Sequence, residues 1–563
     1  MKRDLDRLGQ ERFDLLVVGL GIHGAALARA AALRGYAVAA IEAGDFGGGV
    51  SANSQKVIHG GLRYLQHLDL GRLRESVAAR RRLLRLAPHL VAPLGFVVPT
   101  RGWGLNGPGA MGAALLLYAL LSADRNRGLP PERRLPPARL LGWRRLAALH
   151  PYLAEPATGG ALWYDALARD TERLTLAFVQ AAAEAGAAVA NYLRATGLLR
   201  GGRRVEGVQA VDLEGGREYC VRARCTVLAA GPQTPALWSQ LGGAAPGLRW
   251  ARALNVVVRR PIAGRYALGF PARTTGDREG VPGQGRRLYF CVPWGDANIV
   301  GTEYQPVASA DGAWRAGPAE VGAFLEAFNA SARGVALAAS DVLQVHQGLL
   351  PLADGTDPRS LTLHTRPLLW DARHGPGMEG LLALIGVKFT TATEAADRVL
   401  GRLRDRLGAP RRPAAGGREP PLPGGEAWRA APPEGEMARV LWARYGCRYR
   451  QVLETLRGAP EGGTPVAEGL SLYAGEVRHV VRVEMARRLT DVVARRTGVG
   501  AAGHPGPRVL ERCARIMGAE LGWDEGRRAR EVAEAEAWFR AANPLAPPPR
   551  RDNNADMQSR EGT

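Results

Sequence analysis

Short apolar runs separated by glycine-rich turns make up the first part of the chain. Leu15–Val18 is an apolar run short enough for a buried strand, and Ala37–Ile41 is a second one. Between them, Ala25–Arg34 is rich in alanine and other small residues, which predicts a helix. The pattern therefore predicts a strand–helix–strand unit at the start of a parallel sheet.

The turn of this unit carries a motif with a chemical meaning. Gly19, Gly21 and Gly24 form a G-x-G-x-x-G between the first strand and the helix. Such glycines allow a tight turn, close approach of the backbone to a pyrophosphate, and close helix–strand packing. Glu42, 18 residues after Gly24, follows the second strand, where a carboxylate can bind ribose hydroxyls. The unit predicts a dinucleotide site, and the motif alone fits NAD and FAD equally.

Further apolar runs predict an insertion that interrupts the first sheet. The expected strands of a second, antiparallel sheet are Leu254–Arg259, Arg287–Val292 and Asn298–Gly301. Val205–Leu213 and Arg217–Arg222 predict a β-ribbon, and Thr226–Gly231 predicts a strand that returns the chain to the first sheet. Phe96–Pro99 and Leu381–Ile385 predict two more strands. The expected helices are Gly71–Pro88, Ala110–Leu121, Thr175–Ala185 and Thr391–Leu407.

A change of composition divides the chain into parts. Residues 1–407 hold both predicted sheets, and 408–435 are crowded with Pro, Gly and Arg, which predicts a linker. Residues 436–541 are helical in pattern, and apolar residues at 3–4 spacing predict a helix over Gly475–Arg496. Residues 542–563 are polar and Pro-rich, which predicts a disordered tail. The fold class is therefore α/β: a Rossmann-type domain, an inserted antiparallel-sheet domain and an α-helical C-terminal domain.

The charge of the chain favours acidic partners. The 563 residues carry a net charge of +21, which favours a phosphorylated substrate, an anionic lipid or nucleic acid, or reflects arginine-rich composition alone. A cluster of arginines over Arg72–Arg85 predicts either an exposed helix face or a lipid-headgroup surface. Nucleic acid is not expected, because no aromatic–basic reading module accompanies the charge. The longest apolar run, Gly109–Leu121, is too short to span a bilayer.

The cysteines and the N-terminal residues indicate the cellular compartment in which the protein is expected. The five cysteines form no C-x-x-C pair, which predicts a reducing compartment without a disulfide frame or a metal site. The first 14 residues have no apolar core, so no signal peptide is expected. Any membrane association is therefore expected to be peripheral.

A more specific pattern lies just after the nucleotide-binding unit. Asn53–Leu65 reads NSQKVIHGGLRYL and resembles the corresponding loop of FAD-dependent glycerol-3-phosphate dehydrogenases. The resemblance covers nearly the whole chain. It includes Ala87–Leu90, Trp163–Asp165, Asp170–Leu174, Ala229–Pro232, Val292–Trp294, Gly301–Tyr304, Gly386–Thr391, Arg444–Gly446 and Glu476–Thr497.

The resemblance implies a reaction and a setting. Glycerol 3-phosphate, a small phosphorylated polyol, would lose a hydride to FAD and give dihydroxyacetone phosphate. Electrons would then pass to a membrane quinone, with the protein cytoplasmic and peripheral on the inner face of the membrane. Independently of the resemblance, the net charge of +21, the Arg72–Arg85 cluster and the absence of a long apolar run predict reversible binding to an anionic membrane surface. The oligomeric state is left open, with a homodimer among the options.

The resemblance also assigns roles to residues. Catalytic roles fall to Arg63, Tyr64 and Lys388, and the residues implied to contact substrate are Arg63, Arg366, Asn255 and Thr391. His59 is expected to pack against the flavin loop. The residues implied to bind FAD are Gly19, Gly21, Gly24, Glu42, Ser54, His59, Gly60, Gly61, Gly231, Gly386, Lys388 and Thr390.

Two positions depart from the family pattern. Asn255 stands where the family has a histidine, and Leu350 stands where it has an arginine, both expected at the substrate. His346, four residues before Leu350, is then the candidate base, since histidine titrates near neutral pH. The departures keep two alternatives open: a diverged oxidase or dehydrogenase of another hydroxy or amino acid, and a flavoprotein without turnover.

Overall fold

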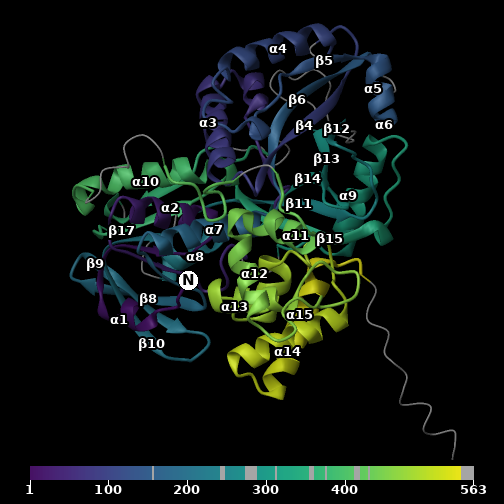
Figure 1. Cartoon of the computed structure of the whole chain (residues 1–563). Helices are drawn as coiled ribbons and strands as arrows, with labels where there is room; N and C mark the ends of the chain where they lie inside the picture. The colour runs from purple at the N-terminus through teal and green to yellow at the C-terminus, as the bar shows by residue number, and fades with distance from the viewer. Residues whose placement is uncertain are drawn as a thin grey trace, which may run out of the picture.

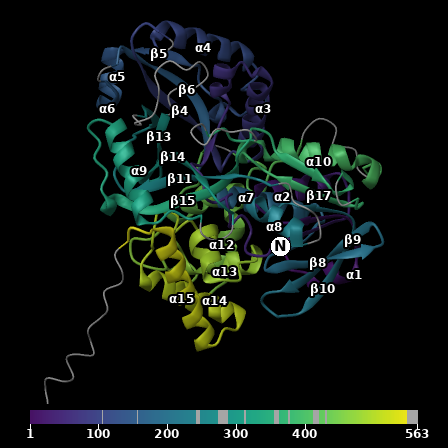
Figure 2. The ribbon, with the colours of Figure 1, turned by 180° about the vertical axis from the view of Figure 1, so that it is seen from behind.

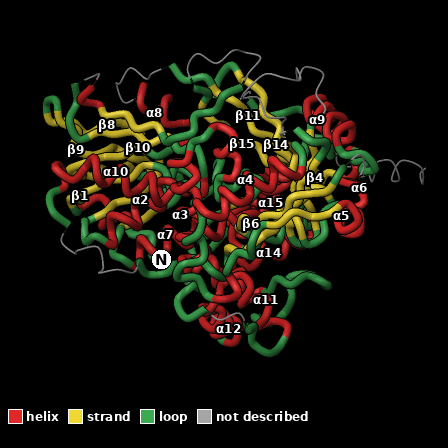
Figure 3. Tube along the Cα trace, turned by 90° about the horizontal axis from the view of Figure 1, so that it is seen from above, coloured by secondary structure: helices red, strands yellow, loops and turns green. Residues whose placement is uncertain are grey.

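The computed structural model shows two sheet domains side by side and a helical domain beneath them (Figure 1). It describes residues 1–104, 106–154, 157–240, 247–272, 288–310, 314–353, 361–374, 377–410, 419–428 and 431–546. Seen from behind, α3–α6 again cover the end of the molecule opposite α14 and α15 (Figure 2). From above, the first sheet and the second sheet lie apart, with helices between and below them (Figure 3).

The first sheet is built around the predicted strand–helix–strand unit. Strands β1, β2, β7, β10 and β17 run parallel, and the order across the sheet is β16-β17-β10-β1-β2-β7. A β-ribbon of β8 and β9 extends from β10. The bounds are β1 (Arg12–Val18), β2 (Val38–Ile41), β7 (Ala188–Ala190), β8 (Leu193–Gly201), β9 (Arg204–Asp212), β10 (Glu218–Leu228), β16 (Leu368–Asp371) and β17 (Leu381–Ile385).

Small residues let three helices pack closely on one face of this sheet. In α2 (Ile22–Leu33), the alanines from Ala25 to Ala32 are buried against α7 (Thr171–Glu184) and α10 (Ala392–Leu407). The opposite face is covered by α1 (Leu5–Gln10), α8 (Thr234–Gln240) and the β8–β9 ribbon, and Leu8 and Trp238 are buried in this second layer. The sheet is therefore buried on both faces, as parallel sheets are.

The second sheet has the order β15-β11-β14-β13-β12-β4-β6-β3, with β5 beside β6. Its pairs are antiparallel apart from β12 with β4. The strands are β3 (Val57–Ile58), β4 (Val91–Thr100), β5 (Arg139–Gly142), β6 (Gly159–Ala168), β11 (Trp250–Val258), β12 (Tyr266–Pro271), β13 (Leu288–Trp294), β14 (Ala297–Val307) and β15 (Val342–Pro351). The helices around it are α3 (Leu70–Leu86), α4 (Pro108–Leu121), α5 (Trp143–Leu149), α6 (Pro151–Ala154) and α9 (Pro318–Ser331).

The C-terminal domain is helical, as predicted, but its clearest predicted helix is wrong. Instead of one helix over Gly475–Arg496, α13 ends at Val483, Met485 has a φ of +54°, and a π-helical turn, η8, spans Asp491–Arg496. The break is held by Asp491, whose carboxylate accepts the N–H groups of Arg487 and Arg488 at 2.8 and 2.9 Å. The other helices are α11 (Glu436–Tyr445), α12 (Tyr449–Arg457), α13 (Ala474–Val483), α14 (Pro507–Leu521) and α15 (Glu525–Ala542).

Other elements differ from the sequence prediction in extent. The two strands expected at Arg217–Arg222 and Thr226–Gly231 are one continuous strand, β10, which pairs with β9 in its first half and with β1 in its second half. Helix α1 and strand β6 were not predicted.

The predicted linker is packed in part: Leu422 is fully buried and the Glu419 carboxylate pairs with Arg82 at 2.7 Å. Residues 411–418, 429–430 and the tail from 547 lie outside the described residues.

The arginine cluster of α3 is not a free basic surface. Arg80 is completely buried and pairs with Asp165, while Arg74 pairs with Asp124 at 2.7 Å and Arg82 with Asp397 at 2.8 Å. Carboxylates distant in sequence therefore neutralise most of this helix, which argues against the lipid-headgroup alternative and favours a helix face held by ion pairs. No helix among the described residues is long and apolar enough to cross a membrane.

Candidate functional site

A cavity of about 1730 Å³ runs across the carboxyl ends of the parallel strands. Its wall includes residues that directly follow β1, β2, β10 and β17, where open α/β sheets bind ligands. Strands of the second sheet close the other side through Asn255, Thr302 and Gly348. The cavity therefore lies between the two sheet domains and is large enough for a dinucleotide and a small substrate.

The glycine turn has the shape that a pyrophosphate site requires. Gly19 has a φ of +101°, and a Cβ there would lie 2.7 Å from the Ala229 carbonyl oxygen. A Cβ at Gly24 would overlap the Gly19 carbonyl oxygen and lie 3.3 Å from Val17 Cγ1. Gly21 is the N-cap residue just before α2 and lines the cavity, so the start of the helix faces it.

Glu42 is fixed by backbone donors at the end of β2. Its Oε2 accepts the Leu20 N–H at 2.7 Å and its Oε1 accepts the Gly44 N–H at 2.9 Å. Burial raises the pKa of this carboxyl, and the backbone hydrogen bonds oppose that rise. Ser51, which the sequence did not single out, accepts the Ile22 N–H at 3.0 Å and ties the following loop to the helix. Glu42 lines the cavity, as a ribose-binding carboxylate must.

One part of the cavity wall carries the cations that the sequence singled out. Arg63 and Tyr64 lie in the 3-10 helix η1 (Leu62–His67), and Lys388 directly precedes η6 (Phe389–Thr391). The Lys388 ammonium lies 4.0 Å from the centre of the Tyr64 ring, a cation–π contact. Burial, together with the nearby Arg63 guanidinium, lowers the pKa of Lys388 to about 8. Segments more than 300 residues apart thus place two cations at one end of the cavity.

A buried network that the sequence did not predict supports this end. The Asp165 carboxylate accepts the Gly60 N–H at 2.6 Å and pairs with Arg80. A Cβ at Gly60 would overlap the Arg80 guanidinium, so only glycine fits there. His59 lines the cavity, with Nδ1 3.9 Å from Asp165 Oδ2. In the sequence, Asp165 stood out only as part of the Trp163–Asp165 segment of the family pattern. Nothing in the sequence predicted its ion pair with Arg80.

Most of the other predicted site residues also line the cavity: Ser54, Gly231, Asn255, Gly386 and Thr390. Asn255 Oδ1 accepts the Thr302 hydroxyl at 2.7 Å. A Cβ at Gly386 would overlap the ring of His23, whose pKa burial lowers to about 4. Gly60 and Gly61 lie behind the wall and shape the loop, with Gly61 at a φ of +84°.

Besides the glycines Gly24, Gly60 and Gly61, three predicted residues are not among the described residues of the wall. His346 is buried, with Nδ1 3.2 Å from the Ser54 carbonyl oxygen and its ring against Trp294. Burial, with Lys56 nearby, lowers the pKa of His346 to about 4. Thr391 is buried at the start of α10, and Arg366 is exposed outside the cavity. The structure therefore does not bring these side chains to Arg63 and Lys388.

Comparison with known proteins first defines the class. A family model for FAD-dependent oxidoreductases matches residues 14–396. A second model, for the C-terminal domain of alpha-glycerophosphate oxidase, matches residues 418–528. Together the two matches cover both sheet domains and most of the helical domain.

Individual relatives then define the family. A glycerol-3-phosphate dehydrogenase of Synechocystis is 30% identical over 88% of this chain and 90% of its own length. The glycerol-3-phosphate dehydrogenase of Pseudomonas aeruginosa is 31% identical over 89% of this chain and 94% of its own length. The crystal structure of the Bacillus halodurans glycerol-3-phosphate dehydrogenase, complexed with FAD, shares the fold, with a TM-score of 0.72 at 23% identity over 97% of this chain and 98% of that one. The chain belongs to the glycerol-3-phosphate dehydrogenase family of FAD-dependent oxidoreductases.

FAD is therefore the cofactor, and the cavity fits it. The glycine turn leaves room for the pyrophosphate, Glu42 can take the ribose hydroxyls, and the cations lie at the end left for the flavin ring. An electropositive surrounding suits a flavin, because reduction adds negative charge to the ring.

The glycine turn generates the first prediction. Gly24→Val is expected to force α2 away from β1, because overpacking of a closed contact costs about 1–3 kcal/mol or more, and so to empty the FAD site. Flavin absorbance of the protein purified with FAD supplied measures the loss. Gly401→Val is the control, because a Cβ at Gly401 of α10 meets nothing within 4 Å. Full flavin content in Gly24→Val would contradict this reading of the turn.

Proposed function

We propose that this protein oxidises glycerol 3-phosphate to dihydroxyacetone phosphate. The observation that carries the proposal is the meeting of Arg63, Tyr64 and Lys388 at one end of the FAD cavity. The names of the relatives agree with this substrate. Bound FAD supplies the acceptor for the hydride from the C2 carbon of the substrate.

The chain's own residues would bind and orient the substrate. A dianionic phosphate pairs best with arginine or lysine, and Arg63 and Lys388 offer both. At pH values below its pKa of about 8, Lys388 is a cation that can hold either the phosphate or the reacting oxygen. The Tyr64 ring keeps that ammonium in place at 4.0 Å.

The two departures from the family pattern also lie in the wall of the cavity. Leu350 and Asn255 both line it, so neither the family's arginine nor its histidine is present there. A leucine cannot pair with phosphate, and an asparagine cannot accept a proton near neutral pH. We therefore expect slow turnover of glycerol 3-phosphate.

Product analysis tests the proposed function. Dihydroxyacetone phosphate formed with a quinone acceptor supports it, whereas peroxide formed in air from another hydroxy or amino acid supports the alternative.

An exposed apolar surface offers a place for a membrane and a quinone acceptor. Helix α4 exposes Leu116 and Leu120 by 64% and 67%, and Trp103, just before it, is fully exposed. Leu68, 77% exposed, directly follows η1, the helix that carries Arg63 and Tyr64. Helix α4 lies at the end of the molecule opposite α14 and α15 (Figure 1). Exposed arginines close to these residues in sequence are Arg134, Arg139, Arg144 and Arg145.

This combination favours peripheral binding to the inner face of the membrane. Apolar side chains can enter the headgroup region while arginines pair with anionic lipids, each contributing about 1 kcal/mol near the surface. The short path from this surface to η1 would let a quinone approach the flavin end of the cavity. Because the arginines of α3 are paired with carboxylates, the surface around α4 replaces them as the proposed contact.

Removing the Lys388 charge is expected to slow the reaction. Losing one charged hydrogen bond in a closed site costs about 2–4 kcal/mol of transition-state stabilisation, roughly 30- to 1,000-fold in kcat/KM. Lys388→Met should show this loss in steady-state kinetics with glycerol 3-phosphate, while Lys2→Met, at an exposed lysine, should not.

In the unmodified protein, kcat/KM should fall as pH rises through about 8, where Lys388 loses its proton. A fall of the same size in Lys388→Met would contradict the assignment.

Restoring the family residues is expected to raise turnover of glycerol 3-phosphate. Leu350→Arg together with Asn255→His returns a phosphate-binding cation and a base to the wall of the cavity. The gain in kcat/KM should be at least tenfold, since one charged hydrogen bond contributes about 1.5–3 kcal/mol. Leu350→Met with Asn255→Gln, which keeps the polarity of both sites, is the matched control. No gain in the double variant would count against glycerol 3-phosphate as the substrate.

The surface around α4 generates a prediction about lipid binding. Co-sedimentation with vesicles that contain phosphatidylglycerol should be strong at low salt and weaker at high salt, because salt screens the arginines. Burying a leucine contributes about 1.5–3 kcal/mol, so Leu116→Asp with Leu120→Asp should weaken binding at least tenfold. Ala519→Asp, at an exposed position of α14, is the control. Unchanged binding of the double variant would exclude this surface.

A further inference from the structure

The C-terminal domain forms part of the wall of the FAD cavity. Its residues in the wall are Arg488, Thr490, Arg495, Glu534 and Trp538. They share the cavity with Glu42 and Asp45 from the end of β2 and with Tyr192 beside β8. The helical domain therefore reaches the nucleotide end of the site, far along the sequence from the glycine turn.

Asp45 is the centre of this contact. Its carboxylate is fully buried and accepts Arg496 Nη1 and Nη2 at 2.7 Å each, in a bidentate pair. Arg495 Nε donates to the same carboxylate at 2.7 Å, and Asn191 Nδ2 donates at 3.2 Å. Burial alone would raise the pKa of Asp45, but Arg496 and Arg495 lower it to about 2. The carboxylate is thus a fixed negative charge held between two arginines of the other domain.

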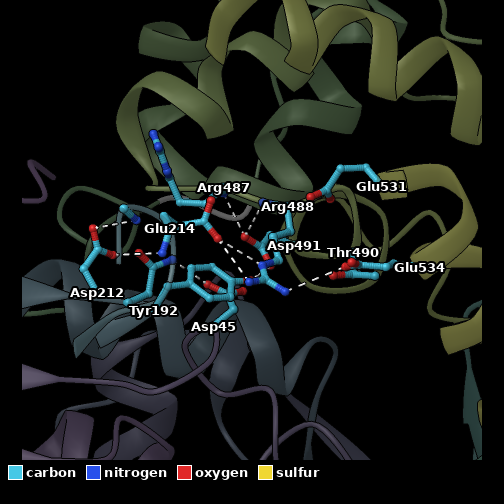
Figure 4. A network of polar contacts seen from close by, with 12 residues as sticks. Asp45, Tyr192, Asp212, Glu214, Arg487, Arg488, Thr490, Asp491, Glu531 and Glu534 are labelled. Atoms are coloured by element: carbon cyan, nitrogen blue, oxygen red, sulfur yellow. Dashed lines mark hydrogen bonds and ion pairs between the residues drawn. The ribbon is translucent and has the colours of Figure 1, made fainter. Parts of the chain in front are cut away.

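The arginines are themselves held by both domains. Arg495 Nη2 donates to Asp491 at 2.6 Å, and the Tyr192 hydroxyl donates to the same carboxylate at 2.6 Å. Arg488 lies over the Tyr192 ring at 4.6 Å and pairs with Glu214 at 3.1 Å. Figure 4 shows the C-terminal residues facing those of the first domain around Asp45. The network therefore joins the two domains at the segment that follows Glu42.

That segment also shapes the ribose site. Gly44 donates its N–H to Glu42, and Gly47 donates its N–H to the Leu20 carbonyl oxygen at 3.1 Å. Asp45 lies between these two glycines, so the arginines that hold Asp45 hold the whole turn. If the C-terminal domain moved away, the Glu42 carboxylate would lose part of the loop that orients it.

We propose that the C-terminal domain is part of the FAD-binding site, with Arg495 and Arg496 as positioning residues for the nucleotide half of the cofactor. They fix the Asp45 turn, and Arg495 also closes the cavity beside it. FAD binding and docking of the helical domain then stabilise each other, and by linkage each strengthens the other equally. This inference depends on FAD binding and not on the identity of the oxidised substrate.

A substitution at Arg496 tests the proposal through the affinity for FAD. Arg496→Gln removes the bidentate pair, and the dissociation constant for FAD should rise at least tenfold. Arg496→Lys keeps the charge and should recover part of the affinity. Arg512→Gln is the control, because Arg512 pairs with Glu461 inside the C-terminal domain. Unchanged FAD affinity in Arg496→Gln would show that the arginine only docks the domain.

A measurement on the unmodified protein keeps the proposal testable if Arg496→Gln does not fold. Hydrogen–deuterium exchange of residues 484–497 is compared between protein stripped of FAD and the same protein reloaded with FAD. Exchange in this segment should be at least several-fold slower with FAD, although the segment lies outside the first domain. Equal exchange in the two forms would overturn the coupling, whatever substrate the enzyme oxidises.

Discussion

The close approach of α2 to β1 is the contact on which the cofactor site depends. Gly24 lies so near the Gly19 carbonyl that no side chain fits between them, and this proximity fixes the start of α2. The helix then directs its first N–H groups into the cavity, and Ser51 and Glu42 bond to the same turn. The sheet order follows from this unit, since β10 and β17 add parallel to β1 and bring their own carboxyl ends to the cavity.

Charge organises the rest of the structure by long-range pairs. The chain has an excess of arginine, yet the buried arginines are paired: Arg80 with Asp165, Arg173 with Glu484, and Arg496 with Asp45. A buried pair that loses one partner leaves an unsolvated charge, which costs about 3–5 kcal/mol. Such pairs therefore fix where one segment meets another. Arg63 and Lys388 differ in that they line the cavity, where an anionic substrate can form ion pairs with them.

The sequence predicted what depends on local pattern. The strand–helix–strand unit, the glycine turn and Glu42 all follow from periodicity and spacing, and the structure has them where expected. The membership in a family of FAD enzymes is confirmed by the relatives. The break after Val483 was not predicted, because apolar spacing continues through it and the cause is the Asp491 carboxylate.

Contacts between residues far apart in the chain could not be predicted from the sequence. The arginines of α3 looked like one basic surface, but their partners lie elsewhere in the chain, as Asp165 does for Arg80. His346 was a reasonable base by residue type, yet the fold turns it toward Ser54 and Trp294. Neither outcome is encoded in spacing, because each depends on which strands and loops meet.

The most direct test of the account is anaerobic mixing of the FAD-loaded protein with glycerol 3-phosphate while flavin absorbance is followed. The account predicts that the yellow absorbance disappears as hydride passes to FAD, slowly because of Asn255 and Leu350, and that dihydroxyacetone phosphate appears in equal amount. A flavin that glycerol 3-phosphate leaves oxidised, but that another hydroxy or amino acid reduces, would contradict it.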